Sequence, residues 1–161
     1  MMRRAVEVGS ATIGAFLAMT LLSKVHFLAG EILNPFVVAV LLIGLTRGEV
    51  AGSVAGAVCG LVADSFSLGL FGIAGLALTP MGFGAGFISR KVNVWATGRL
   101  VVFFFLLAAG EVVLWAGLTA LVFGRAVPWS GGIILAQPAA NALAALGGHR
   151  LLEKVRARHE R

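Results

Sequence analysis

Two acidic residues and two amides stand out in this 161-residue sequence, because they fall inside apolar stretches. Glu111 lies in the middle of the longest stretch, and Asp64 ends an earlier one. Gln137 and Asn141 lie within the last. An ionisable group at the centre of a membrane helix costs roughly 2.5 to 3.5 kcal/mol on insertion scales, so the two acidic residues are each expected to have a specific role.

These polar residues do not form a catalytic constellation. The sequence has no nucleophile, base and acid at a spacing typical of an enzyme mechanism, no zinc-protease motif and no phosphate-binding loop. The three histidines fall at predicted helix ends or in the C-terminal tail. The one cysteine, Cys59, lies in an apolar segment, which favours neither a disulfide framework nor a metal site. We therefore expect no enzymatic activity and no cofactor.

Three roles remain open for Glu111. Its carboxyl group could form a hydrogen bond across the helix interface to Gln137 or Asn141, contact the transmembrane helix of a partner, or take part in proton or substrate binding. A proton pathway normally needs a chain of such groups, and the sequence shows none. The hydrogen bond within the chain is the expected role.

The composition predicts the elements that must position these residues. Hydrophobic residues make up 59% of the chain and charged residues 12%, against about 25% charged residues in an average soluble domain. We expect an all-α integral membrane protein, with one transmembrane domain over residues 1–152 and a basic cytoplasmic tail over 153–161. The six predicted transmembrane helices span residues 6–26, 35–47, 49–64, 73–89, 99–123 and 133–152.

The basic residues predict the orientation of this bundle. With six alternating helices, eleven of the thirteen Lys and Arg residues fall on one side, and only Lys24 and Arg125 fall on the other. Cytoplasmic loops carry such an excess, so both termini are expected in the cytoplasm. The basic residues expected to meet anionic lipids at the membrane surface are Arg90, Lys91, Arg150, Lys154, Arg156 and Arg158.

The basic tail is expected to anchor the topology, and docking of a cytoplasmic partner is the alternative. No basic face with interleaved aromatic residues is present, so a nucleic-acid partner is not expected.

The second and third predicted helices form a short hairpin. Asn34 and Pro35 are typical of a helix start, as N-cap and first helical residue. The following apolar residues, 36–46, span only about 20 Å, so this helix is expected either to cross a thinned bilayer or to lie inside the bundle. Gly48, between two charged residues, is expected to make the tight turn, because glycine tolerates a positive φ.

Glycines recur at every fourth position across this hairpin, at Gly44, Gly48, Gly52, Gly56 and Gly60, and the last three line one stripe of the third helix. Such faces let another backbone approach closely, with dispersion contacts and weak Cα–H hydrogen bonds. Packing within the bundle is the expected use of the stripe, and contact with another subunit is the alternative. In the next helix, Pro80 with Gly82, Gly84 and Gly86 indicates a loosened stretch.

Asp64 is at the C-terminal end of the third helix, where the helix macrodipole disfavours a carboxylate. A specific partner is therefore expected. Lys24 and His26, at the same end of the first helix, are candidates within the chain, and an interaction site for another protein is the alternative.

Together these motifs resemble those of the bacterial rod shape-determining MreD family. The resemblance rests on Pro35 at a helix start, Arg47-Gly48-Glu49, the spaced glycines up to Gly60-Leu61-x-x-Asp64, and Leu68-Gly69-x-x-Gly72, over about residues 34–90. It implies a fold similar to the substrate-binding subunits of energy-coupling-factor transporters. The residues it implies for helix packing or partner contact are Gly48, Gly52, Gly56, Gly60, Asp64, Gly69 and Gly72.

The resemblance also implies a function and partners. The chain would be a multi-pass scaffold of the cell-elongation machinery in the bacterial inner membrane, and it would bind the transmembrane helix of MreC. It would lie beside the peptidoglycan synthases RodA and a class B penicillin-binding protein, with the MreB filament at the cytoplasmic face.

The alternative function is a transporter substrate-binding subunit. Such subunits also have six helices and dock through small residues spaced four apart, which Ala11 and Ala15, or Gly14 and Ala18, would supply. The short predicted outer loops, poor in polar groups, argue against it, since ligand pockets present convergent polar groups.

Overall fold

The computed structural model describes residues 9–10, 12–18, 20, 32–65, 71–94, 96–124 and 131–159, without the side chains of residues 131–133, 155, 156 and 159. The described residues form helices joined by turns and short connections, and none of them lies in a β-strand. The all-α prediction is therefore confirmed for this part of the chain.

Five helices have defined bounds: α3 (Pro35–Arg47), α4 (Glu49–Asp64), α5 (Ile73–Lys91), α6 (Thr97–Phe123) and α7 (Gly131–His159). The bounds of α3 and α4 match the predicted ones, and α5, α6 and α7 are longer than predicted. The described residues between Gly9 and Thr20 are helical and lie within the predicted helix 6–26. Because α7 continues to His159, the predicted boundary between transmembrane domain and tail falls inside one continuous helix.

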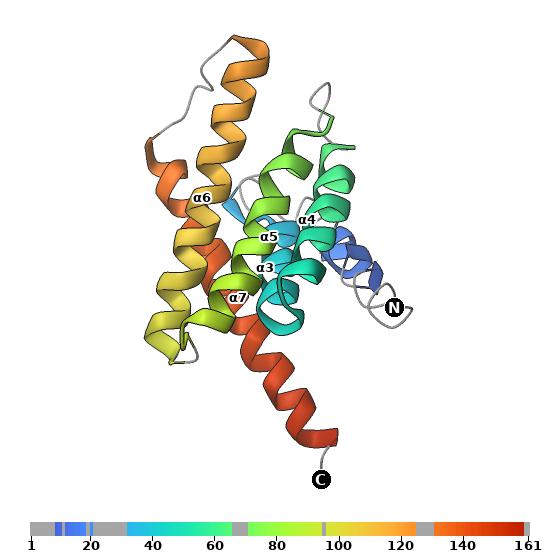
Figure 1. Cartoon of the computed structure of the whole chain (residues 1–161), viewed down its shortest axis with the longest axis vertical. Helices are drawn as coiled ribbons and strands as arrows, with labels where there is room; N and C mark the ends of the chain where they lie inside the picture. Colours follow the sequence, from blue (N-terminus) through green and yellow to red (C-terminus); the bar gives the residue numbers. More distant parts are fainter. Residues whose placement is uncertain are drawn as a thin grey trace.

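The helices run up and down beside one another (Figure 1). Helix α4 packs along α5, and α6 packs along α7, while α3 contacts both pairs. The N-terminal helical residues lie on the side of α4, where the Thr12 hydroxyl is 3.3 Å from the Cys59 sulfur. The C-terminal part of α7 extends beyond the rest of the bundle.

Helix α3 is the centre of the core although it is the shortest of the five. Phe36, Val37, Val40 and Leu41 are almost completely buried, because α4, α5, α6 and α7 all contact α3. Its 13 residues span about 20 Å. A helix enclosed in this way does not need to match the bilayer thickness by itself, which agrees with the second of the two predicted arrangements.

Both ends of α3 are closed by specific hydrogen bonds. At its start, the Asn34 side chain accepts from the Phe36 amide at 3.1 Å, as predicted for an N-cap, and the Asn34 amide donates to Oδ1 of Asn141 on α7 at 2.9 Å. At its end, the Gly48 amide donates to the Gly44 carbonyl at 2.9 Å. Gly48 has φ 93° and ψ −179°, a region open essentially only to glycine, so the predicted glycine turn is confirmed.

Among the described residues, α6 is long and apolar enough to cross a membrane by length and composition. It has 27 residues and favours membrane association. Helix α3 is also apolar but shorter than a membrane span.

Candidate functional site

The glycine stripe of α4 lies against α5. A Cβ atom placed on Gly52, Gly56 or Gly60 would come within 3.0 Å of backbone atoms of α5, a distance that real Cβ atoms essentially never show. The backbone atoms involved belong to Gly82, to Leu78 and Thr79, and to Ala74 and Gly75. The stripe is therefore occupied within the chain, and α4 and α5 meet through their backbones.

Helix α5 supplies a complementary glycine face, where the sequence predicted a loosened stretch. Gly82 meets the Gly52 carbonyl, and Gly86 meets the backbone at Gly48 and Glu49. We interpreted the glycines after Pro80 as loosening the helix, yet α5 is continuous from Ile73 to Lys91. The spacing in the sequence could have predicted this glycine face, because Gly75, Gly82 and Gly86 are seven and four residues apart and so share one side of the helix.

Asp64 caps the start of α5. Its carboxylate is 2% exposed and accepts hydrogen bonds from the backbone amides of Gly72 at 2.8 Å, Ala74 at 3.1 Å and Gly75 at 3.3 Å. Gly72 itself is left-handed, with φ 98°. The position is unfavourable with respect to α4 but favourable with respect to α5, whose N-terminal amides and positive dipole end the carboxylate meets.

Asp64 thus has a structural partner that the sequence analysis did not name. We expected Lys24 or His26, and both lie outside the described residues, as does Gly69 of the predicted contact set.

A second charged contact closes the other end of the α4–α5 pair. Arg90, in the last turn of α5, donates to Oε1 of Glu49, in the first turn of α4, at 2.9 Å. Both charges suit the dipoles of their own helices. A side chain on Gly48 would collide with the Arg90 guanidinium group. Arg90 is 61% exposed and Glu49 27%, so this pair contributes at most about 1 kcal/mol.

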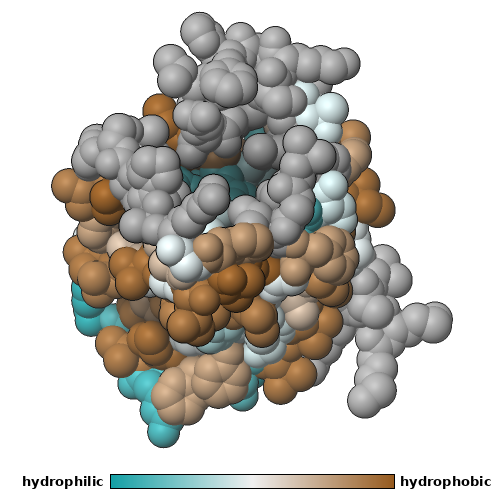
Figure 2. Space-filling view, turned by 90° about the horizontal axis from the view of Figure 1, so that it is seen from above, coloured by the Kyte–Doolittle hydropathy of each residue, from teal (hydrophilic) through white to brown (hydrophobic). Residues whose placement is uncertain are grey.

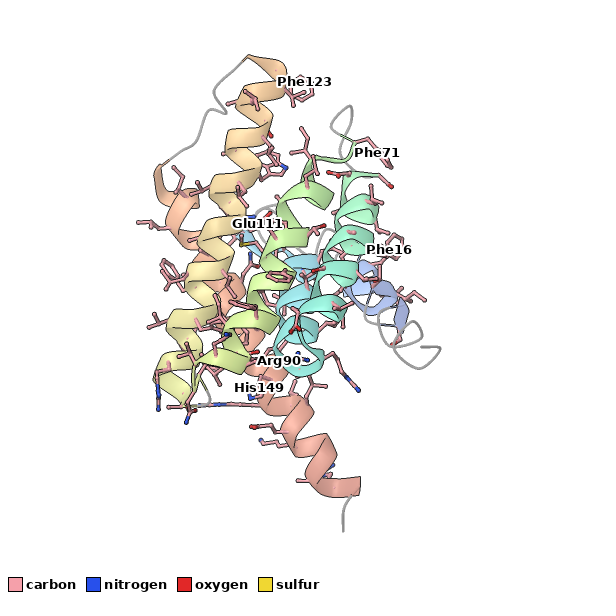
Figure 3. The ribbon with its side chains drawn as sticks, in the orientation of Figure 1. Phe16, Phe71, Arg90, Glu111, Phe123 and His149 are labelled. Atoms are coloured by element: carbon pink, nitrogen blue, oxygen red, sulfur yellow. The ribbon has the colours of Figure 1, made fainter. Side chains whose placement is uncertain are left out.

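Glu111 does not form the hydrogen bond that we expected. It is 5% exposed on α6, and its Oε2 has no hydrogen-bond partner among the described residues. Asn141, fully buried on α7, accepts with Oδ1 from the Asn34 amide of α3, and its Nδ2 has no partner within the described ranges. The Asn141 side chain, which we expected to bond to Glu111, instead accepts a hydrogen bond at the start of α3. Figure 3 shows Glu111 on the side of α6 that faces α5. Gln137 is half-buried, and in the described part of the chain it forms no hydrogen bond with Glu111 or Asn141.

The predicted surface residues are exposed wherever their side chains are described. Arg90 and His149, both labelled in Figure 3, lie at one end of the bundle. The side chain of Arg156 is outside the description. The other predicted basic residues on this end are exposed: Lys91, Arg150, Lys154 and Arg158.

The outer face of α4 is apolar. Val50, Val54, Val58 and Leu61 are exposed at three- and four-residue steps, on the side away from the glycine stripe. Phe83 and Phe87 are exposed on α5 and stack at 5.7 Å between ring centroids. Figure 2 shows hydrophobic side chains over much of the surface seen from above. The α4–α5 pair therefore turns glycines inward and large apolar side chains outward.

In comparisons with known proteins, no protein-family model, curated protein or solved structure matches this chain.

Gly56→Leu is expected to reduce the free energy of unfolding by about 3 kcal/mol, because the new side chain meets the backbone of α5, which cannot rotate away. The measurement is unfolding of the purified protein in mixed dodecyl maltoside and SDS micelles. The control is Val54→Leu on the exposed face of the same helix, expected to change stability by less than about 0.5 kcal/mol. Equal effects of the two substitutions would contradict the close α4–α5 contact.

Asp64→Ala is expected to destabilise the protein by about 2 kcal/mol or more, since three amides at the start of α5 lose a charged acceptor. Asp64→Asn, which keeps one acceptor oxygen, should cost roughly half as much. The same unfolding titration measures both, with Glu49→Ala, expected to cost less than about 1 kcal/mol, as the comparison. A larger loss of unfolding free energy for Glu49→Ala than for Asp64→Ala would contradict the conclusion that the Asp64 cap is the stronger contact.

Proposed function

We propose that this chain is a multi-pass protein of the bacterial cytoplasmic membrane and a non-catalytic scaffold of the cell-elongation machinery, as its resemblance to the MreD family implies. The observation that carries the proposal is the role of the residues behind that resemblance. Gly48 makes a turn, Gly52, Gly56 and Gly60 bring two backbones together, and Asp64 caps a helix. These roles build a rigid surface rather than a reaction centre.

Exposed apolar side chains support a membrane location for more than one helix. Large hydrophobic residues are exposed on the N-terminal helical segment and on α4, α5, α6 and α7, and Leu121, Leu135 and Leu143 are among them. Contiguous apolar surface of this extent is rare on soluble monomers. Lipid tails would cover it without cost, which favours a bundle of spanning helices over one spanning helix.

The charges of the described residues support an orientation with the C-terminal end of α7 in the cytoplasm. The ends of α3 and α5, the start of α6 and the C-terminal part of α7 share one end of the bundle (Figure 1). The described basic side chains there are Arg47, Arg90, Lys91, Arg99, Arg150, Lys154 and Arg158. A cytoplasmic location of this end follows the positive-inside rule and would bring these groups to the side of the MreB filament.

The partner's transmembrane helix needs a free surface, and the glycine stripe is not one. Because α5 covers that stripe, we place the MreC-type helix on the outer face of α4, at Val50, Val54, Val58 and Leu61. The stripe then acts indirectly, by holding α4 rigidly so that this face has a fixed shape. Docking there would leave the other exposed helices for RodA and the class B penicillin-binding protein.

A second candidate function, the substrate-binding subunit of an energy-coupling-factor type transporter, is favoured by one observation. Glu111 and Asn141 are buried, and each has a polar atom without a partner among the described residues. Buried polar groups of this kind are typical of ligand sites within helical bundles.

The scaffold proposal predicts co-purification with a co-expressed single-pass partner of the MreC type. Val54→Trp and Val58→Trp should lower recovery of the partner at least tenfold, because a bulky side chain prevents close packing on the outer face of α4. The control is Val113→Trp, at an exposed position of α6, which should leave recovery unchanged.

If Val113→Trp alone abolished recovery of the partner, the interface would lie on α6 and not on the outer face of α4. Failure of the unchanged chain to bind this partner, together with a small molecule retained through purification and identified by mass spectrometry, would refute the scaffold in favour of the transporter subunit.

A further inference from the structure

Helix α7 carries one exposed face from Leu143 to Arg158, and this face changes character at the end of the bundle. Leu143, Gly147, Arg150, Lys154 and Arg158 follow one another at three- and four-residue steps and are all exposed. Residues at these steps share one side of a helix. The face is therefore apolar or neutral down to Gly147 and basic from Arg150 onward.

The opposite side of α7 is attached to the bundle as far as His149. Asn141, Ala142, Ala145 and His149 are buried. A Cβ atom on Gly148 would be 2.8 Å from Leu42 of α3, so the attachment is close at this level. The His149 imidazole is 3.4 Å from the Glu153 carboxylate one turn later, which links the attached part of the helix to the part that extends beyond.

The length of α7 agrees with this change of character. Its 29 residues span about 44 Å, more than the hydrocarbon core of about 30 Å, so one end must lie outside the hydrocarbon. The charges identify the C-terminal end. From Arg150 to Arg158 the helix rises about 12 Å, which is more than one headgroup layer of about 5 to 8 Å, and long basic side chains can reach back toward that layer.

We infer that the exposed face of α7 formed by Arg150, Lys154 and Arg158 binds the phosphodiester headgroups of anionic phospholipids in the surrounding membrane. A lipid is favoured over an acidic protein because the same face carries the exposed Leu143 and Gly147 above Arg150, a surface that lipid tails would cover. The tails of a lipid would contact the upper part and its headgroup the lower part. The inference requires the membrane location but neither of the two candidate functions.

The inference predicts a preference of the purified full-length chain for phosphatidylglycerol over phosphatidylcholine. Bound lipid is counted by native mass spectrometry after titration in detergent, and we expect at least a tenfold preference. Each basic side chain near an anionic surface contributes a factor of about five. The triple substitution Arg150→Gln, Lys154→Gln and Arg158→Gln should therefore lower the preference at least tenfold, with unchanged helicity because all three side chains are exposed.

The control removes basic groups from the same end of the bundle but from other helices, as Arg47→Gln and Arg99→Gln, and is compared with the double substitution Arg150→Gln and Lys154→Gln on α7. It should lower the preference less than threefold. An equal loss in the control would show an effect of total charge and overturn the assignment to α7, as would equal binding of the two lipids by the unchanged chain.

A second titration uses an acidic peptide of twenty glutamates as the probe for a protein partner. Binding of this peptide that depends on the three α7 residues, with lipid preference unaffected by their substitution, would reassign the face to a protein and overturn the inference. Lipid preference lost with the three residues, and no such peptide binding, would support it.

Discussion

The close approach of α4 and α5 is the contact on which the rest of the described structure depends. Glycines on both helices remove the side chains that would hold the backbones apart, so the two helices meet through backbone atoms. In a lipid environment, where apolar side chains gain little by leaving the solvent, dispersion and weak Cα–H hydrogen bonds at such short range are the main source of helix association. Gly44 brings the end of α3 to the same place, close to Gly82 and Ala85, so three helices converge on this contact.

Electrostatics completes the pair at its two ends. Antiparallel helices place the positive end of one dipole beside the negative end of the other, and the chain adds a charged group at each end. Asp64 caps the amides at the start of α5, while Glu49 and Arg90 pair where α4 starts and α5 ends. The Asp64 contact is the stronger, because its carboxylate is buried and accepts from several amides, whereas Arg90 is largely exposed to screening.

A rigid interior and an apolar exterior together favour a role in assembly. The glycine faces are buried between α4 and α5, so they are not available to another protein. Recognition by such a protein would use the large side chains on the outside, as on the outer face of α4. The polar atoms of Glu111 and Asn141 that have no partner among the described residues are the part of the interior that this role does not explain, and they are the basis of the transporter alternative. The basic face of α7 serves either role, since it concerns only how the bundle meets its membrane.

The sequence by itself determined the helical class, the bounds of α3 and α4 and the glycine turn at Gly48, because these depend on local backbone preferences and on spacing along one helix. It also showed that Asp64 needs a partner. Only the tertiary structure decided which surface the glycine stripe meets, that Gly82 and Gly86 form its counterpart, that Asp64 serves the helix after its own, and that Asn141 bonds to Asn34 instead of Glu111. The physical reason is that helical periodicity places residues on a face, whereas the partner of that face depends on how helices distant in sequence come together in space.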